Sequence, residues 1–232
     1  MAISANHIIA DIRNIASSNT NSDNFKASTE QILFWVEEIR AVLIGQSLSK
    51  KDDINDSWVQ YIPCLQLTQV DISECCEIAT GCYLLRTVNP LPSTIDTYKD
   101  NWLVSVTTPY NDIISKSNTF KSRYQQYNKY TATKPVWYIK NDFLYITNNT
   151  FMEYVNVAGL FDRPSELANF SNCSGEKCWS MNSEYPVSLT IASQITDIVL
   201  KTKVYPMLSS MSDTSNNASG VTPQQSDINK KE

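Results

Sequence analysis

The sequence of 232 residues has a net charge of −5, a pI near 5.0 and a hydrophobic content of 42%. This hydrophobic content excludes a generally disordered chain, and the acidic balance argues against a surface built to neutralise the phosphates of nucleic acid. Because no apolar run approaches the ~20 residues that span a bilayer, and the first residues lack the basic and apolar regions of a signal peptide, we expect neither a membrane anchor nor export.

Two helices are predicted in the first quarter of the chain. Ile8, Ile12 and Ile15 recur at helical spacing and predict a first helix over residues 4–18. A run of Asn, Ser, Thr and Asp then leads to a second helix over residues 28–46. Two helices joined by a loop of this length are expected to pack as an antiparallel hairpin.

The second helix carries apolar residues on more than one side. It begins with the signature of a capping box, Ser28 followed by Gln31, in which both side chains satisfy backbone N–H groups of the first turn. Apolar residues form one face, and others, such as Phe34, fall outside it. Such a helix lies either between two packed layers of one domain or at a subunit contact. Glu37 and Arg40, three residues apart, are predicted to form an exposed ion pair.

Short apolar or alternating segments between residues 58 and 158 predict β-strands. The clearest signal is a hairpin, in which residues 136–139 and 143–146 flank the turn sequence Lys-Asn-Asp. The other predicted strands cover residues 58–62, 65–70, 83–88, 102–106 and 152–157. Together these segments predict an antiparallel, twisted sheet with many aromatic cross-strand pairs.

A modest basic and aromatic cluster lies within this β region. Its members are Lys121, Arg123, Lys129 and Lys134, interleaved with Tyr124, Tyr127 and Tyr130. Such a segment can stack on the bases of nucleic acid. The favoured interpretation is a solvated polar helix or loop at an interface.

The last predicted helix covers residues 186–204. Pro186 suits its first position because the missing N–H would have no partner there, and Pro206 is expected to end it. From Leu208 onward the composition shifts to Ser, Asn, Asp, Thr and Gln, so residues 208–232 are predicted to be an extended polar tail that is ordered only against a partner. The expected partner-binding side chains of this tail are Leu208, Met211, Val221 and Ile228.

The sequence offers little material for catalysis or cofactor binding. It lacks Gly-rich phosphate-binding loops and the G-x-S-x-G turn of hydrolases, and it contains a single histidine, His7. We therefore expect no enzymatic activity, no catalytic residues and no cofactor. The region of Cys75, Cys76 and Cys82 is the one candidate for a nucleophile.

Cys173 and Cys178 form a C-x4-C pair around a glycine. They are weak candidates for metal ligands, because a structural zinc site needs four soft ligands and this pair supplies two. A disulfide between them is sterically conceivable. We favour reduced, partly buried cysteines that pack as small hydrophobic groups, as expected of a protein made in a reducing cytoplasm.

The predicted elements combine into an α+β fold. The N-terminal helical hairpin and the C-terminal helix are expected to pack with the central antiparallel β region in one domain over residues 1–207, and residues 208–232 form the extended tail.

The order of these segments resembles that of the head–tail ring proteins, also called connectors or adaptors, of crAss-like bacteriophages. The segments that carry the resemblance are Gln31–Gln46, Ile62–Asp71, Glu74–Cys76, Gly81–Pro90, Cys173-Ser-Gly and Tyr185-Pro186. They cover roughly residues 5–207 as an order of motifs. No segment of the tail contributes to the resemblance.

The resemblance implies a structural virion protein that forms an oligomeric ring, with twelve copies below a dodecameric portal. Such a ring in the phage neck or tail barrel links the capsid to the tail and lines the DNA exit channel without binding DNA specifically. The implied partners are further copies of the chain and the portal or neighbouring rings, whereas no membrane is involved. The protein is expected to be made in the host cytoplasm and to act in the virion. The family has no catalytic residues to carry over.

A ring subunit must bury lateral faces against both neighbours through heterologous contacts. The candidate interface residues are Phe34, Trp35, Arg40, Trp102, Trp137, Tyr138 and Tyr145. The alternative role of the aromatic residues is packing in the core of the subunit. The alternative function is a soluble, monomeric binding or regulatory module of a phage that is not part of the particle.

Overall fold

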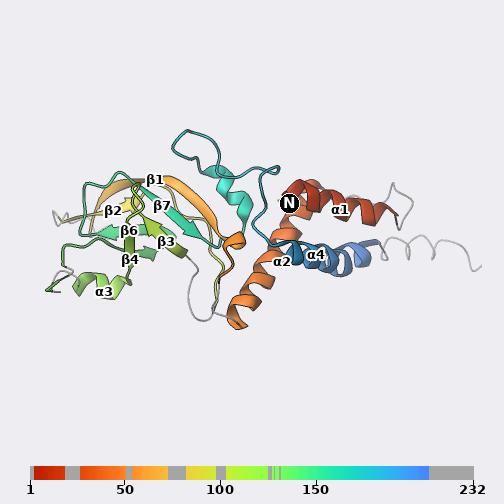
Figure 1. Cartoon of the computed structure of the whole chain (residues 1–232), viewed down its shortest axis with the longest axis horizontal. Helices are drawn as coiled ribbons and strands as arrows, with labels where there is room; N and C mark the ends of the chain where they lie inside the picture. Colours follow the sequence, from red (N-terminus) through yellow and green to blue (C-terminus); the bar gives the residue numbers. More distant parts are fainter. Residues whose placement is uncertain are drawn as a thin grey trace, which may run out of the picture.

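The computed structural model describes residues 3–18, 27–50, 54–72, 82–97, 103–124, 127, 129–130 and 132–208. The molecule is elongated, with a β-barrel at one end and helices at the other (Figure 1). The predicted α+β class is confirmed in this coarse form. The predictions for Trp102, Cys75, Cys76, Met211, Val221 and Ile228 lie outside the described residues.

The helical end consists of α1 (Ala5–Ser18), α2 (Thr29–Lys50) and α4 (Leu189–Val199), with a π-helical turn η4 (Leu200–Val204) after α4. α1 and α4 lie side by side, and both pack against α2 (Figure 1). Their contact faces are fully buried and apolar, so the hydrophobic effect holds the three helices together. The innermost side chains are Ile8, Ile12, Ile32, Val36, Ile195 and Val199. Ile15, predicted on the buried face of α1, is 37% exposed instead.

The start of α2 agrees with the capping signal. The Ser28 hydroxyl accepts a hydrogen bond from the N–H of Gln31 at 3.1 Å, as the N-cap of a helix does. The helix runs to Lys50, beyond the predicted end at residue 46. The extra turn persists because Ile44 and Leu48 are buried in a second apolar cluster, together with Trp58 and two other side chains.

Two boundary predictions for the last helix are wrong. α4 is capped by Ser188, whose hydroxyl accepts from the N–H of Ile191, so Pro186 lies before the helix and not at its first position. Pro206 does not end the helix, since helical turns continue to Leu208. In the wide turn before this proline, the N–H of Tyr205 bonds to the carbonyl of Leu200 five residues back, which is the spacing of a π-turn.

Seven strands form the other end of the molecule. They are β1 (Gln60–Asp71), β2 (Tyr83–Thr87), β3 (Leu103–Thr107), β4 (Ile113–Lys116), β5 (Val136–Lys140), β6 (Phe143–Thr147) and β7 (Tyr154–Gly159). Paired in the order β1-β2-β6-β5-β4-β3-β7, they close into a barrel, which leaves no unpaired sheet edge.

The expectation of a wholly antiparallel sheet is wrong for one pair. β4 and β5 are parallel, because the chain crosses from one to the other through α3 (Thr119–Tyr124). Parallel neighbours require such a crossover, whereas antiparallel ones need only a turn. The strand β4 and its pairing were not predicted.

Two local features of the barrel have clear causes. The β5–β6 hairpin is confirmed, and Asn141 and Asp142 in its turn both adopt positive φ, as a two-residue type I′ turn requires. β1 unites two predicted strands, and its register shifts between Ile62 and Leu65. Cys64, at φ +54°, lies in this bulge, which redirects its side chain.

Barrel and helices share one hydrophobic core. Side chains that fill the barrel, such as Leu85, Val106 and Leu144, belong to the same buried cluster as the helix faces. Each such side chain contributes roughly 1.5–3 kcal/mol to stability through burial. The segments that join the two ends include the short helices η1 (Asp56–Trp58) and η3 (Pro164–Asn169). Among the described helices, none combines the length and hydrophobicity needed to cross a bilayer.

Candidate subunit contact surfaces

Arg40 is fully buried where the barrel meets the helices. Its guanidinium donates to three backbone carbonyls, at 3.0 Å to Pro186, 2.7 Å to Phe161 and 3.2 Å to Trp58. Trp58 precedes the first strand, Phe161 follows the last one and Pro186 precedes α4. Through these hydrogen bonds, Arg40 links the three chain segments that connect the helices to the barrel. It leaves no surface for a neighbouring subunit, which corrects its prediction as an interface residue.

Glu37 is also buried, so the predicted exposed ion pair between Glu37 and Arg40 is wrong. Its carboxylate accepts hydrogen bonds from the N–H of Ser165 at 2.8 Å and from its hydroxyl at 3.1 Å. Burial raises the pKa of Glu37, while the hydrogen bonds from Ser165 and the charge of Arg40 act in the opposite direction. Glu37 thus anchors η3 to α2 within the subunit.

Three of the predicted interface aromatics lie in the barrel wall. Trp137 is 2% exposed and donates its indole N–H to the carbonyl of Ile114 at 3.0 Å. Tyr138 and Tyr145 are buried and stack with ring centroids 5.3 Å apart. These side chains stabilise the barrel, as in the core-packing alternative, and little of their surface is accessible to a partner.

Two predicted interface residues on α2 keep accessible surface. Phe34 is 46% exposed, and its ring lies 5.2 Å from the guanidinium carbon of Arg163. Trp35 is partly buried and packs against the edge of the main core. Val42, on the same helix, is 53% exposed. The outer side of α2 therefore remains a candidate contact face.

A more exposed set of aromatic side chains lies on α3 and in the turns that follow it. Phe120, Tyr124, Tyr127 and Tyr130 are between 69% and 82% exposed. Lys121 and Lys129 are exposed among them, and the ammonium group of Lys129 lies 5.3 Å from the Tyr130 ring. We call these six residues the basic aromatic surface. Apolar side chains this exposed on a folded domain are typical of contact sites.

A hollow of about 720 Å³ lies beside α3 on the outside of the barrel. Thr119 and Ser122 line it from α3, while Tyr83 and the loop after β6 line it from other directions. Phe151 in that loop is 93% exposed at its margin. One side of α3 therefore faces a hollow large enough for several side chains, and its other side carries the basic aromatic surface.

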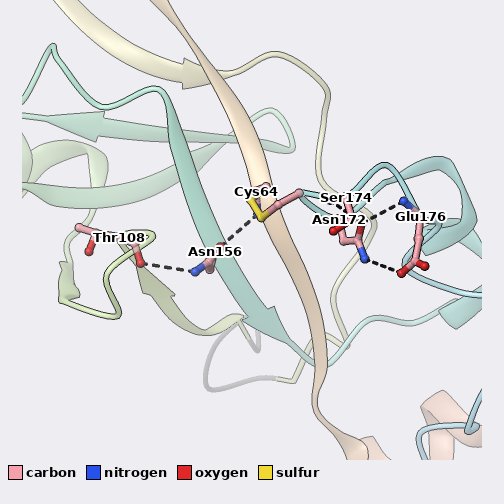
Figure 2. The surroundings of a disulfide bond; sticks show 7 residues. Cys64, Thr108, Asn156, Asn172, Ser174 and Glu176 are labelled. Carbon is pink, nitrogen blue, oxygen red and sulfur yellow. Dashed lines mark hydrogen bonds between the residues drawn. A yellow bond between two sulfur atoms is a disulfide. The ribbon is translucent and has the colours of Figure 1, made fainter.

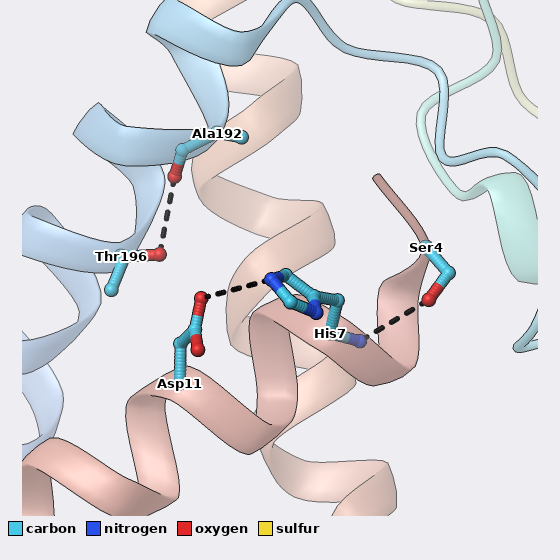
Figure 3. A network of polar contacts seen from close by, with 5 residues as sticks. All are labelled: Ser4, His7, Asp11, Ala192 and Thr196. Atoms are coloured by element: carbon cyan, nitrogen blue, oxygen red, sulfur yellow. Dashed lines mark hydrogen bonds and ion pairs between the residues drawn. The ribbon is translucent and has the colours of Figure 1, made fainter. Parts of the chain in front are cut away.

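A second hollow, of about 390 Å³, lies between α1 and α4. His7 and Asp11 from α1 contribute to its polar lining, and their side chains are 3.7 Å apart (Figure 3). Thr196 faces them from α4, but its hydroxyl is satisfied by the carbonyl of Ala192 at 3.2 Å (Figure 3). This is a shallow groove between two helices, with polar groups that already have partners in the chain.

The structure contains a disulfide between Cys64 and Cys173, with Cα atoms 5.2 Å apart (Figure 2). The expectation of a reduced cysteine is therefore wrong for Cys173, and the Cys173–Cys178 pairing does not occur. The bond joins β1 of the barrel to the segment between η3 and α4. The bulge at Cys64 is held by Asn156, whose side-chain oxygen accepts the Cys64 N–H at 3.1 Å.

A tight turn presents Cys173 to Cys64. The side-chain oxygen of Asn172 accepts the N–H groups of Ser174 and Glu176, each at 2.9 Å, and its amide donates to the Glu176 carboxylate (Figure 2). Gly175 has φ +83°, which a residue with a side chain rarely adopts. Sequence spacing could not reveal this disulfide, because 109 residues separate its two cysteines.

Of the weak metal and nucleophile candidates, the structure describes Cys173, Cys178 and Cys82. Cys173 is oxidised and cannot act as a thiolate ligand, and Cys178 is partly buried, which raises the pKa of its thiol. Cys82 is exposed and immediately precedes β2. Within the described ranges, no three His, Cys, Asp or Glu side chains are arranged to hold a metal ion.

Comparison with known proteins gives one positive result. Residues 7–228 match a family described as phage tail ring protein 2. The match covers the helices and the barrel and extends into the C-terminal segment. No curated protein matches the chain at a significant level.

Proposed function

Because the chain belongs to the phage tail ring protein 2 family, we propose that it is a structural virion protein whose copies assemble into a closed ring. The ring lies in the neck or tail barrel below the portal, links the capsid to the tail and contains twelve copies, matching a dodecameric portal. The protein is made in the host cytoplasm and acts without a cofactor. The observation that carries this proposal is the family match over residues 7–228.

The distribution of exposed apolar side chains supports self-assembly. In a closed ring each subunit contacts its two neighbours through two different surfaces. The outer side of α2 exposes Phe34 and Val42, and the barrel part of the molecule exposes the basic aromatic surface and Phe151. One described subunit therefore exposes apolar side chains on two different surfaces, one on α2 and one on the barrel, as heterologous contacts require.

The acidic character of the chain supports a role as a DNA channel without specific binding. A surface with an excess of carboxylates repels phosphates, so duplex DNA can pass without being retained. Acidic residues are therefore expected to prevail on the face that lines the channel.

The oligomeric state of the purified chain tests the ring. Native mass spectrometry and negative-stain imaging are expected to show closed rings of one size, with twelve copies. A chain that remains monomeric at every concentration would favour the alternative of a soluble binding or regulatory module. Rings with another copy number would retain the structural role and exclude the match to a dodecameric portal.

The C-terminal tail is proposed to bind the adjacent ring, through Met211, Val221 and Ile228. Leu208 is better assigned to the last helical turns, because it packs against the main core. Truncation after Leu208 is expected to leave the thermal transition of the subunit unchanged and to weaken binding to the neighbouring ring, as measured by co-sedimentation. A truncated chain that fails to fold would show that the tail belongs to the core of its own subunit.

A further inference from the structure

We propose that the basic aromatic surface on α3 and the following turns is the contact through which one subunit binds the acidic surface of a second copy of this chain. The inference rests on the proposed ring and identifies one of its two lateral faces. The second copy is favoured as the occupant by charge complementarity, by the exposure of the surface and by the kind of side chains that it carries.

Basic and acidic residues are unevenly distributed along the sequence. Between Ile113 and Lys140 there are six basic residues and no acidic residue, whereas the whole chain has a net charge of −5. The remaining sequence therefore has a net charge of −11. A basic surface on one copy and an acidic remainder on the next attract each other, and this pairing is head-to-tail, as a ring requires.

The exposed side chains are suited to a protein partner. Phe120 and Tyr124, one helical turn apart, are 76% and 69% exposed, and Tyr127 and Tyr130, in the turns that follow, are 76% and 82% exposed. Tyrosine and phenylalanine are enriched where protein interfaces are fully desolvated. The hollow beside α3 adds space in which side chains of a partner can pack.

Duplex DNA explains these observations less well. Contacts to the phosphates of a duplex need positive charge but gain nothing from exposed aromatic rings, and stacking on those rings requires unpaired bases. A basic surface in the channel would also retain DNA that has to pass. The exposed aromatic side chains therefore favour a protein partner over duplex DNA at this surface.

The test is a charge reversal, K121E/K129E, in the full-length chain. Both lysines are exposed, so the circular dichroism spectrum and the thermal transition should match those of the wild type. Sedimentation velocity is expected to show self-association weakened at least about tenfold, and wild-type association should decline as salt is raised. The matched control is K177E, which reverses an exposed lysine outside the surface and should associate like the wild type.

Zero-length carbodiimide cross-linking of the wild-type oligomer provides a second readout. Peptides that contain Lys121 or Lys129 are expected to be joined to acidic peptides of another copy. If K121E/K129E associates like the wild type and these cross-links are missing, the inference is overturned while the ring proposal stands. If association is unchanged but binding to a short duplex DNA is lost, the surface belongs to DNA. If the wild type never associates, the ring proposal and this inference both fail.

Discussion

Replacement of Arg40 by methionine is expected to lower the free energy of unfolding by about 3–5 kcal/mol. Methionine fills a similar volume but donates no hydrogen bond, so the carbonyls of Trp58, Phe161 and Pro186 would remain in the interior without the donors that they have now. In a chain of this size, such a loss corresponds to a decrease in Tm of roughly 6–20 °C. Thermal and urea denaturation measure it.

The position of Arg40 explains why this effect is expected to be large. Each of the three carbonyls belongs to a segment that connects the helices to the barrel, and burial of the guanidinium lowers the pKa of Arg40 by disfavouring its charged form. The charges of Glu37 and Asp162 favour the cation in turn. Arg40→Lys should recover part of the stability, because lysine keeps the charge but lacks the planar set of donors.

Lys201→Met is the matched control for Arg40→Met. Lys201 forms an exposed ion pair with Asp197 at 2.7 Å, and such pairs are worth about 0–1 kcal/mol. If Arg40→Met lowers the free energy of unfolding no more than Lys201→Met does, the three carbonyls find other donors. Arg40 is then not required to link the helices to the barrel.

Removal of the Cys64–Cys173 disulfide is expected to destabilise the subunit by about 2–4 kcal/mol. The bond closes a loop between residues 109 positions apart, and its loss gives the unfolded chain many more conformations. The double variant C64A/C173A and the wild type treated with dithiothreitol should show the same decrease in Tm. Cys178→Ala is the control, since Cys178 forms no disulfide.

Two further observations distinguish a stabilising disulfide from an incidental one. Non-reducing peptide mapping should recover Cys64 and Cys173 in one linked peptide pair. Amide exchange is expected to rise first around the turn at Asn172 after reduction, because this turn is tied to the barrel through Cys173. A wild-type Tm that does not respond to dithiothreitol would contradict the stabilising role.

Local signals in the sequence predicted much of the secondary structure. The N-cap at Ser28 and the hairpin turn at Asn141 and Asp142 depend on a few neighbouring residues, and both occur as expected. The order of segments also carried the family resemblance, which the match to the ring family confirms. The strand β4 was missed because it has only four residues and owes its place to pairing with β3 and β5.

The features that join distant segments could not be read from the sequence. Arg40 looked like the partner of Glu37 one helical turn away, but its donors reach carbonyls as far as 146 residues along the chain. The closure of the sheet and the Cys64–Cys173 bond likewise depend on the tertiary fold. Trp137, Tyr138 and Tyr145 were assigned to an interface because an aromatic side chain in a strand looks the same whether it faces a core or a neighbour.

Quantitative mass spectrometry of purified phage particles tests the proposed role most directly, by measuring the number of copies of this chain per portal subunit. A ring of twelve copies below a dodecameric portal predicts a ratio near one to one. Absence of the chain from particles would contradict a structural role in the virion.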